Sequence, residues 1–375
     1  MISLNDFYQG FRDPQTIRHL AQLIAQQAAK TTEQINIMEV CGGHTHTIMK
    51  YGLLQLLPDN IHFIHGPGCP VCVMPKERID HAATLASQAD TILVTLGDMI
   101  RVPGSMGSLA QFRANGCDIR PIYDPLDTLK IAQDNPDKTV IFFAIGFETS
   151  TPMTAALLAQ AEALKIDNIL FHINHVLVPP AIDAVMSDSR SKVNAFIGPA
   201  HVSVISGAQI YQSTVDHYKT PVVVSGFEPV DVMESILRIT RQKVAGKAEL
   251  DNQYSRSVSY EGNIAAQQLV DKYFMVRDSF RWRGLGPIAK SALTLRPEYH
   301  HRDAERIYAK VLPTTEIDDH KACMCGDILR GLANPKDCKV FGRGCSPQTP
   351  LGSCMVSSEG ACNAYYRYGE VNHDI

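Results

Sequence analysis

Short apolar runs alternate with stretches of helical pattern through most of this chain, and this alternation constrains its fold more than any other feature. Residues 76–89, 152–164 and 229–245 have helical character between such runs. Strands that are apolar on both faces and alternate with helices are typical of parallel sheets covered on both sides. The sequence therefore predicts an α/β fold. The runs, each ending in glycine or polar residues, are INIMEVCGG, IHFIHGPGC, TILVTLGDM, TVIFFAIGFETS, NILFHINHV, NAFIGPAHVS and PVVVSGFEP.

We expect two successive parallel-sheet, doubly wound (Rossmann-like) domains, followed by a loop-rich C-terminal domain. A chain of 375 residues is long enough for two or three domains. The segment AQDNPDKT is rich in residues that end helices and strands and marks the first boundary. The predicted domains are 1–138, 139–247 and 248–375. Residues 1 to about 30 are predicted to be helical and to pack on the C-terminal domain.

Composition excludes several classes of protein. The formal net charge is −4 and no block of Lys and Arg stands out, which argues against nucleic-acid binding. No run of about 18 or more apolar residues predicts a membrane span. Residues 1–15 contain charges and lack a long apolar core, so they are unlike a signal peptide. We therefore expect a cytoplasmic protein that binds neither nucleic acid nor membrane.

The chain contains ten cysteines, and this number calls for an explanation in a protein expected to be cytoplasmic. Cytoplasmic proteins rarely keep structural disulfides, so clustered cysteines there indicate metal or redox chemistry. Cys117, alone in ANGCDIR, is assigned to packing, and six of the others fall within residues 323–375. The remaining nine positions are Cys41, Cys69, Cys72, Cys323, Cys325, Cys338, Cys345, Cys354 and Cys362.

Polar side chains follow nearly every predicted strand at its carboxyl end. Ligands of open α/β sheets bind at this edge, where loops lead into helices. If the strands are parallel, residues that are scattered in sequence meet in space. The residues placed at this edge are Cys41, His44, Cys69, Cys72, Asp98, Glu148, Thr149, His175, His201, Ser203 and Glu228.

Cys41 has the sequence setting of a reactive thiolate. It precedes two glycines and a predicted helix start, where backbone N–H groups and the helix dipole are expected to lower its pKa. His44 or His46 is the candidate proton acceptor, or the partner that orients a metal ligand. The alternative for each histidine is a capping or core role.

Cys69-Pro-Val-Cys72 is a CxxC, a spacing suited to holding one metal ion or closing a reversible disulfide. A zinc site would need a second pair, and the nearest cysteines in sequence are Cys41 and Cys117. A thioredoxin-type CxxC opens a helix, whereas Pro75 follows this one closely. A third thiol from Cys41 would make a three-cysteine site.

The tail, CMCGDILRGLANPKDCKVFGRGCSPQTPLGSCMVSSEGACNAYYRYG, holds six cysteines among Gly, Pro and Ser. This composition predicts a loop-built domain organised around a metal centre. The paired CxxC spacing typical of tetrahedral zinc is absent from it, and the CxxxCxxC of radical-SAM enzymes occurs nowhere in the chain. Four thiolates could hold an iron–sulfur cluster and leave two thiols as a redox pair. Structural zinc is the alternative.

Together, CGGHTH, GPGCPVC, GFETS, GPAHVS and CMVSSEGACNAYYRYG resemble the hydrogenase maturation factor HypD family over essentially the whole chain. The one departure is Ser150, where the family motif has threonine. The resemblance implies two α/β domains plus a cluster domain. It also implies a role in assembling the Fe(CN)2CO unit of [NiFe]-hydrogenases. The protein would then act indirectly on the hydrogenase large subunit.

The resemblance further implies partners and roles. A HypC-like chaperone would hold the iron together with Cys41, and a HypE-like protein would supply the cyanide. Cys69 and Cys72 would form a redox-active pair or assist in holding the iron. The tail cysteines would bind a [4Fe-4S] cluster that feeds electrons to the site. We expect three further residues, at other strand ends, to position protons or bind the donor: Glu148, His201 and Glu228.

Six tail thiols exceed the four that a cluster needs. The two side chains of Cys323-x-Cys325 tend to diverge, so we assign only the first to the cluster. Cys362 opens the aromatic segment NAYYRY, which could shield a cluster from solvent. The predicted cluster ligands are Cys323, Cys338, Cys345 and Cys362, and Cys325 and Cys354 are a redox pair or alternative ligands.

Two functions fit these residues. The first is a metallocentre-assembly scaffold with redox function, which acts on partner proteins. The second is a stand-alone thiol–disulfide reductase with an electron-relaying iron–sulfur cluster. Cys41 separates them, because a reductase needs only the CxxC and the cluster.

Overall fold

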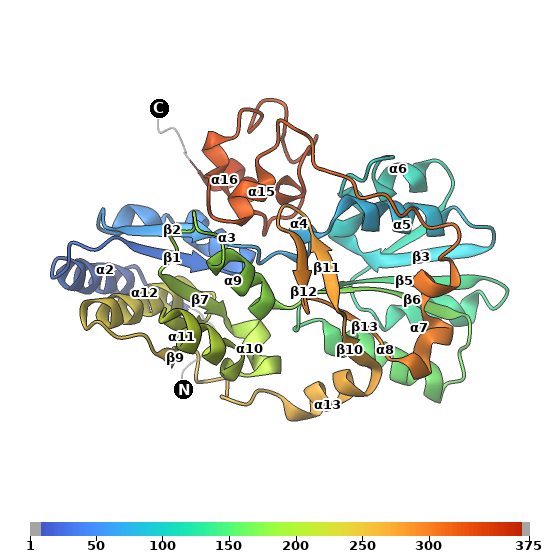
Figure 1. Ribbon diagram of the computed structural model, residues 1–375, viewed down its shortest axis with the longest axis horizontal. Coiled ribbons are helices and arrows are strands. Elements are labelled where there is room, and N and C mark those ends of the chain that lie inside the picture. The colour runs from blue at the N-terminus through green and yellow to red at the C-terminus, as the bar shows by residue number, and fades with distance from the viewer. Residues whose placement is uncertain (1–8, 370–375) are drawn as a thin grey trace.

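Two parallel β-sheets form the body of the protein, and a loop-rich module lies above the junction between them (Figure 1). The computed structural model describes residues 9–369. The first sheet has the strand order β2-β1-β7-β8-β9, and the second has the order β4-β3-β5-β6. All neighbouring strands within both sheets are parallel. The predicted α/β fold with two Rossmann-like sheets and a loop-rich C-terminal region is confirmed.

The strands take up the apolar runs of the sequence. Those of the first sheet are β1 (Ile35–Glu39), β2 (Ile61–His65), β7 (Ala195–Pro199), β8 (Val222–Ser225) and β9 (Leu250–Asn252). Those of the second sheet are β3 (Thr91–Leu96), β4 (Asp118–Ile122), β5 (Thr139–Gly146) and β6 (Ile169–His175). Two small antiparallel pairs follow: β10 (Phe274–Val276) with β13 (Leu293–Leu295), and β11 (Ser279–Trp282) with β12 (Gly286–Ala289).

Helices connect the strands and cover the sheets. They are α2 (Pro14–Ala28), α3 (Gly42–Lys50), α4 (Pro70–Val73), α5 (Lys76–Ala86), α6 (Leu109–Ala114), α7 (Asp127–Asp134), α8 (Thr151–Ala163), α9 (Val178–Met186), α10 (Ala200–Ser206), α11 (Gln212–Tyr218), α12 (Pro229–Val244), α13 (Ile264–Tyr273), α14 (Ala304–Ile307), α15 (Cys325–Leu329) and α16 (Ala361–Tyr368). Short 3-10 turns are η1 (Leu53–Leu56), η2 (Gly97–Arg101), η3 (Ala208–Tyr211), η4 (Pro297–Arg302), η5 (Pro335–Asp337) and η6 (Ser353–Met355).

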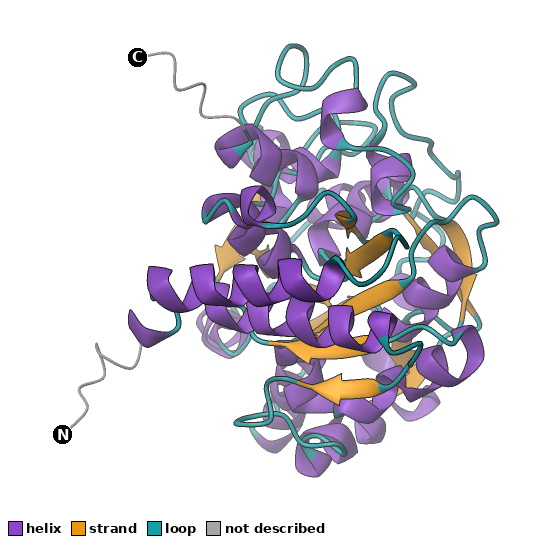
Figure 2. Cartoon of the chain, turned by 90° about the vertical axis from the view of Figure 1, so that its left-hand side faces the viewer, coloured by secondary structure: helices purple, strands orange, loops and turns teal. Residues whose placement is uncertain are grey.

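Helix α2 shows how sequence pattern positions a covering helix. Asp13 caps its start by accepting a hydrogen bond from the Thr16 backbone N–H at 2.8 Å, and proline occupies the first helical position. Apolar residues at helical spacing, including Ile17 and Ile24, are buried. The buried face packs against α12, beside which α2 lies in front of the sheet in Figure 2. The predicted helix is therefore present within the described residues, but it packs on α12 and not on the cysteine-rich tail; residues 1–8 of the predicted segment lie outside the described part.

The predicted domain boundary between residues 138 and 139 is wrong, because the strands on either side of it belong to the same sheet. Strands β3 and β5 lie on either side of that boundary and pair with each other in the second sheet. Strand β1 pairs with β7, although nearly half of the chain lies between them in sequence. The second sheet is thus inserted between two parts of the first. Apolar runs show where strands form, but they do not show which strands pair, so the sequence suggested two successive halves.

The predicted boundary at residue 248 also needs correction. Strand β9 follows it and still pairs with β8 in the first sheet. Helix α13 packs against α8, and β13 packs against β6. The module that carries the tail cysteines comprises residues 322–369, and we call it the cysteine-rich module. It contacts the body through α16 against α3 and through η6 against α4.

Within residues 9–369, no helix combines the length and apolarity needed to cross a membrane.

Candidate functional site

Cys41 and Cys69 follow neighbouring parallel strands and meet at their carboxyl ends. The register of β1 and β2 places Glu39 beside His65, so both loops leave the sheet at the same level. A Cβ atom added to Gly68 would lie 2.1 Å from the Val40 carbonyl carbon and 2.2 Å from the Cys41 nitrogen. Only glycine permits this close approach of the two backbones. The CxxC is therefore held directly against the Cys41 peptide.

Cys41 lies at the first turn of α3, where it is the N-cap residue and is only 3% exposed. Its Sγ accepts a hydrogen bond from the Gly43 backbone N–H at 3.4 Å. The His201 Nε2 atom, at the start of α10, lies 3.9 Å from the same sulfur. The aromatic ring of Phe227 packs against His201, with 5.0 Å between ring centroids. The first and second halves of the chain thus meet at this thiol.

Burial raises the pKa of the Cys41 thiol well above its usual value, and the nearby carboxylate of Glu359 raises it further. The hydrogen bond from Gly43 acts in the opposite direction, but it is the smaller effect. The expectation that the helix terminus lowers this pKa is therefore wrong for the metal-free protein. At neutral pH the group is a thiol. A bound cation would reverse this balance, because metal coordination favours the thiolate.

His44 and His201 are both held neutral. Burial lowers the pKa of His44 to about 3 and that of His201 to about 4. The Nε2–H of His44 donates to the Gly226 carbonyl at 3.0 Å, and its ring stacks on Phe227 at a centroid distance of 4.4 Å. His201, and not His44, faces the sulfur of Cys41. His46 is half-buried and packs edge-on against Tyr368.

Cys69 and Cys72 form a disulfide, with their Cα atoms 5.2 Å apart. Cys69 caps the single helical turn α4, so this CxxC does open a helix, although Pro75 ends the region soon after. Both residues are buried. Among the described residues 9–369, no group of three or more His, Cys, Asp or Glu side chains is arranged to hold a single metal ion. The three thiols at positions 41, 69 and 72 therefore do not form a ready three-ligand site, and iron binding by them stays a prediction.

Glu39 was missed by the sequence analysis, because it ends an apolar strand and gave no separate signal. It is 1% exposed. Its carboxylate accepts hydrogen bonds from the Thr45 hydroxyl and, at 3.3 Å, from the Cys41 backbone N–H, and it pairs with His65 Nδ1. His65 Nε2 lies 3.0 Å from the Tyr365 hydroxyl of α16. One buried carboxylate thus joins the Cys41 turn, both strand ends and the cysteine-rich module.

Glu148 lies at the carboxyl end of β5. Its Oε1 accepts a hydrogen bond from the Val178 backbone N–H at 2.9 Å, whereas the buried Oε2 has no hydrogen-bond partner among residues 9–369. Burial raises the pKa of this carboxyl to about 7. The charges of Glu148 and Cys41 both raise the pKa of Tyr211, after burial itself. Tyr211, a second residue missed in the sequence, therefore lies near both groups.

Two other predicted edge residues have structural partners. Glu228 pairs with Arg12, whose Nη2 lies 2.9 Å from Glu228 Oε1, and this ion pair ties the chain before α2 to the start of α12. His175 Nε2 lies 2.8 Å from the Thr154 hydroxyl, and burial lowers the pKa of this histidine to about 3. Neither residue contacts Cys41 in the structure.

The six cysteines of the cysteine-rich module fall into two groups, one disulfide-bonded pair and four free thiols. Cys325 and Cys354 form a disulfide with their Cα atoms 6.4 Å apart, the same two residues that the sequence analysis paired. The other four are free cysteines. Charges on the other three raise the pKa of Cys362, after the larger effect of burial, so Cys362 lies within electrostatic reach of each of them. The free thiols are Cys323, Cys338, Cys345 and Cys362. Four gathered, largely buried thiols fit the donor set of an iron–sulfur cluster.

The two disulfides are linked through Ser353. Its hydroxyl donates to the Cys72 carbonyl at 2.6 Å and lies 3.9 Å from the Cys325 sulfur. A Cβ atom on Gly352 would lie 2.7 Å from the Cys323 sulfur and 3.5 Å from the Cys325 Cβ atom. Cys323, the module disulfide, the CxxC and Cys41 therefore form one continuous series of contacts.

Comparisons with known proteins identify the family of the chain. The family model HypD, described as "Hydrogenase formation hypA family", matches residues 15–369. The chain belongs to the HypD family. It is 49% identical to the hydrogenase maturation factor HypD of Azotobacter vinelandii over 369 residues, which cover 97% of each chain. It is 43% identical to the HypD of Escherichia coli K12 over 366 residues, or 96% of this chain and 98% of that one. The predicted membership of the HypD family is confirmed, and it assigns the chain a role in hydrogenase maturation.

The Gly68→Ala variant tests the close contact between the two loops. The added methyl would overlap the Val40–Cys41 peptide, so we expect a loss of about 1–3 kcal/mol in the free energy of unfolding, measured by urea denaturation. Gly97→Ala is the matched control, because a Cβ atom there meets nothing within 4 Å. Equal stability of the two variants would contradict the proposed packing.

Glu148→Gln tests the buried carboxyl. Its folded-state pKa of about 7 lies above the ordinary value of 4.5, so the folded protein binds the proton more tightly than the unfolded chain does. The free energy of unfolding therefore falls as the pH rises from 4.5 to 7. Glutamine cannot ionise, so the variant should be more stable at pH 8 by up to about 3 kcal/mol and nearly unchanged at pH 4.5. Urea denaturation at both pH values measures this. The exposed Glu249→Gln should show no such difference, and a pH-independent effect at Glu148 would refute the assignment.

Proposed function

We propose that this HypD-family protein is an assembly scaffold that holds iron while the cyanide and carbon monoxide ligands of a [NiFe]-hydrogenase are attached. The observation that carries the proposal is the continuous series of contacts from Cys41, through the CxxC and the module disulfide, to Cys323, one of the four free thiols. A protein that only bound iron would need no such series. The iron with its ligands is the cargo of this reaction.

Cys41 is the proposed protein ligand of that iron, together with a cysteine of a HypC-like chaperone. Thiolates are soft ligands suited to low-valent iron. His201 lies 3.9 Å from the Cys41 sulfur and is neutral, so it can relay to solvent, without keeping it, the proton that the thiol loses on binding the metal. Phe227 packs on His201 and keeps its ring beside the sulfur.

The CxxC supplies electrons for the delivery of cyanide. Release of cyanide from a thiocyanate group on a HypE-like donor takes two electrons and yields one thiolate and one cyanide ion. Cys69 and Cys72, when reduced, give these two electrons as they lose two protons and close into the disulfide. Glu148, with its pKa of about 7, can take up or return a proton at neutral pH near Tyr211.

The four free thiols of the module are the proposed ligands of a [4Fe-4S] cluster. Such a cluster, when bound, supplies one electron at a time at low potential. The Cys325–Cys354 disulfide lies between these thiols and the CxxC, with Ser353 touching both sides, so it can pass reducing equivalents by thiol–disulfide exchange. The CxxC disulfide would thereby be reduced again to two thiols after each delivery of cyanide.

The Cys41→Ala variant tests the proposal. The fold and the cysteine-rich module should remain, but the protein co-purified with its HypC-like partner should lack the infrared bands of iron-bound cyanide and carbon monoxide. The matched control is Cys117→Ala, because Cys117 is a half-buried free thiol away from the carboxyl ends of the strands and should leave the bands intact. Bands of normal strength in Cys41→Ala would remove Cys41 as a ligand and favour the thiol–disulfide reductase.

Single serine substitutions test the assignment of the module thiols. Iron content and the visible absorption of the cluster should be lost when any of the four free cysteines is replaced. Cys325→Ser and Cys354→Ser should keep the cluster, because these two sulfurs are bonded to each other. Retention of the cluster after loss of any free cysteine would show that this partition is wrong. The four positions are Cys323, Cys338, Cys345 and Cys362.

A further inference from the structure

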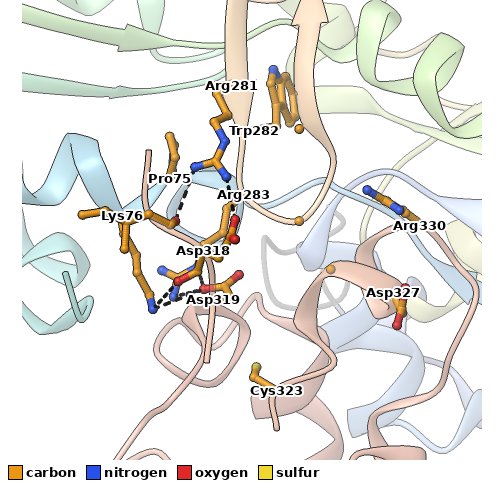
Figure 3. A pocket seen from close by; sticks show the side chains of 14 residues that line it. Pro75, Lys76, Arg281, Trp282, Arg283, Asp318, Asp319, Cys323, Asp327 and Arg330 are labelled. Atoms are coloured by element: carbon orange, nitrogen blue, oxygen red, sulfur yellow. Dashed lines mark hydrogen bonds and ion pairs between the residues drawn. The ribbon is translucent and has the colours of Figure 1, made fainter. Parts of the chain in front are cut away.

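Two separate sets of contacts fasten the cysteine-rich module, and the segment that leads into it, to the body of the protein. Figure 3 shows one set, in which Arg281 and Arg283 of the β11–β12 hairpin pair with Asp318 and Asp319 at 3.0 and 2.6 Å, respectively. These ion pairs hold the segment before the module. The side chain of Asp318 is 95% exposed, so solvent weakens its pair. The other set is buried and reaches Cys41.

The buried set begins at two residues that lie close in sequence to proposed cluster ligands. Tyr365 lies one helical turn after Cys362 on α16, and Asn334 precedes Cys338 by one short turn, η5. The Nδ2–H of Asn334 donates to the Tyr365 hydroxyl at 3.1 Å. Tyr365 is 6% exposed. The position of its hydroxyl is therefore set by the two segments that carry these cysteines.

From Tyr365 the hydrogen bonds run in one direction to the turn of Cys41. Because the Tyr365 oxygen accepts from Asn334, its own O–H donates to His65 Nε2, 3.0 Å away. The other ring nitrogen of His65, Nδ1, then carries a proton and donates it to Glu39 Oε1 at 2.5 Å. Glu39 Oε2 accepts the backbone N–H of Cys41 at 3.3 Å. Every donor points toward Glu39, and hydrogen bonds in such an order strengthen one another.

Glu39 is placed to fix the turn that presents Cys41. Besides the Cys41 backbone N–H, its carboxylate accepts the hydroxyl of Thr45, which lies in the first turn of α3. Its backbone carbonyl accepts the Gly66 N–H at 2.9 Å, so the same residue also holds the loop that leads to the CxxC. Glu39 is 1% exposed. A carboxylate is costly to bury, so its position depends on keeping these donors.

We propose that Glu39 is the positioning residue of the iron site, and that Tyr365 of the cysteine-rich module holds it in place through His65. The carboxylate fixes the Cys41 turn and thereby the direction of the sulfur. The inference rests on the proposed function, since it assumes iron at Cys41 and a cluster in the module. It makes the module a part of the iron site as well as a source of electrons, because Cys41 is held correctly only when α16 is seated on α3.

Labelling of Cys41 by N-ethylmaleimide tests the hydrogen-bond series in the full-length, cluster-loaded protein. Cys41 is 3% exposed, so it reacts only when its turn opens. Peptide mass spectrometry measures its rate relative to that of Cys117, a free thiol outside the series. Tyr365→Phe removes one hydroxyl and keeps the ring. We expect this variant to raise the rate ratio about tenfold, the size expected for the loss of one buried hydrogen bond.

Tyr366→Phe is the matched control, because it makes the same change at the next residue of α16, which is 43% exposed. It should leave the rate ratio unchanged.

Glu39→Gln is the second variant. Both carboxylate oxygens of Glu39 accept hydrogen bonds, whereas the amide of glutamine has one acceptor atom, so one donor loses its partner. We expect a rate ratio at least as high as that of Tyr365→Phe. The double variant should match Glu39→Gln alone, because Tyr365 acts through Glu39 and the two effects are then not additive.

Infrared spectra of the complex co-purified with the HypC-like partner connect the series to iron binding. At equal cluster absorption, Tyr365→Phe should show severalfold weaker bands of iron-bound cyanide and carbon monoxide than Tyr366→Phe. A merely structural role of Tyr365 would lower the cluster absorption and the bands together.

The outcomes separate this inference from the proposed function. The inference is wrong if Tyr365→Phe leaves the rate ratio unchanged, or if the effects of the two single variants add in the double variant. It is equally wrong if the bands keep their full strength although the rate ratio rises. In each of these cases the proposed function stands, provided that the unaltered complex shows the bands. If the unaltered complex lacks them, the proposed function fails, and the labelling rates still decide whether Tyr365 holds Cys41 through Glu39.

Discussion

The direct contact between the Gly68 backbone and the Val40–Cys41 peptide is the constraint on which the rest of the site depends. It exists because β1 and β2 are parallel, in register and adjacent, so that their loops emerge side by side. With no side chain between them, the CxxC lies directly against the N-cap of α3. The cysteine-rich module then packs on this pair of loops, with the backbone of Glu359 against Gly42. Every other contact of the site is arranged around these backbones.

Burial sets the electrostatics of the site in the metal-free protein. It raises the pKa of Cys41 and lowers those of the two neighbouring histidines, so that all three groups are neutral at pH 7. A neutral site costs less free energy to bury than a charged one. The Cys41 sulfur becomes charged only together with a partner, such as a bound cation, and the proton that it then loses passes to solvent. Proton transfer and metal binding are therefore coupled in the proposed reaction.

The sequence predicted the local features well and the long-range ones poorly. Apolar runs located the strands, and their carboxyl ends correctly brought Cys41 and the CxxC together. The interleaving of the two sheets could not be predicted, because pairing of β1 with β7 depends on packing and not on local pattern. The lowered pKa expected for Cys41 was wrong for a similar reason, since the groups that surround it, including His201 and Glu359, come from distant segments. Glu39 was overlooked because a carboxylate at the end of an apolar strand becomes significant only once its buried partners are known.

The interleaved order of strands also affects how the chain acquires its structure during synthesis. The second sheet is formed from consecutive segments, β3 to β6, and its contacts are comparatively local. The first sheet has to wait for β7, which emerges from the ribosome long after β1. Contacts between residues far apart in sequence form late, because closing a long loop costs conformational entropy. Since His201 directly follows β7, Cys41 gains this neighbour only after more than half of the chain has been made, and a chain truncated before β7 would leave that thiol without its histidine.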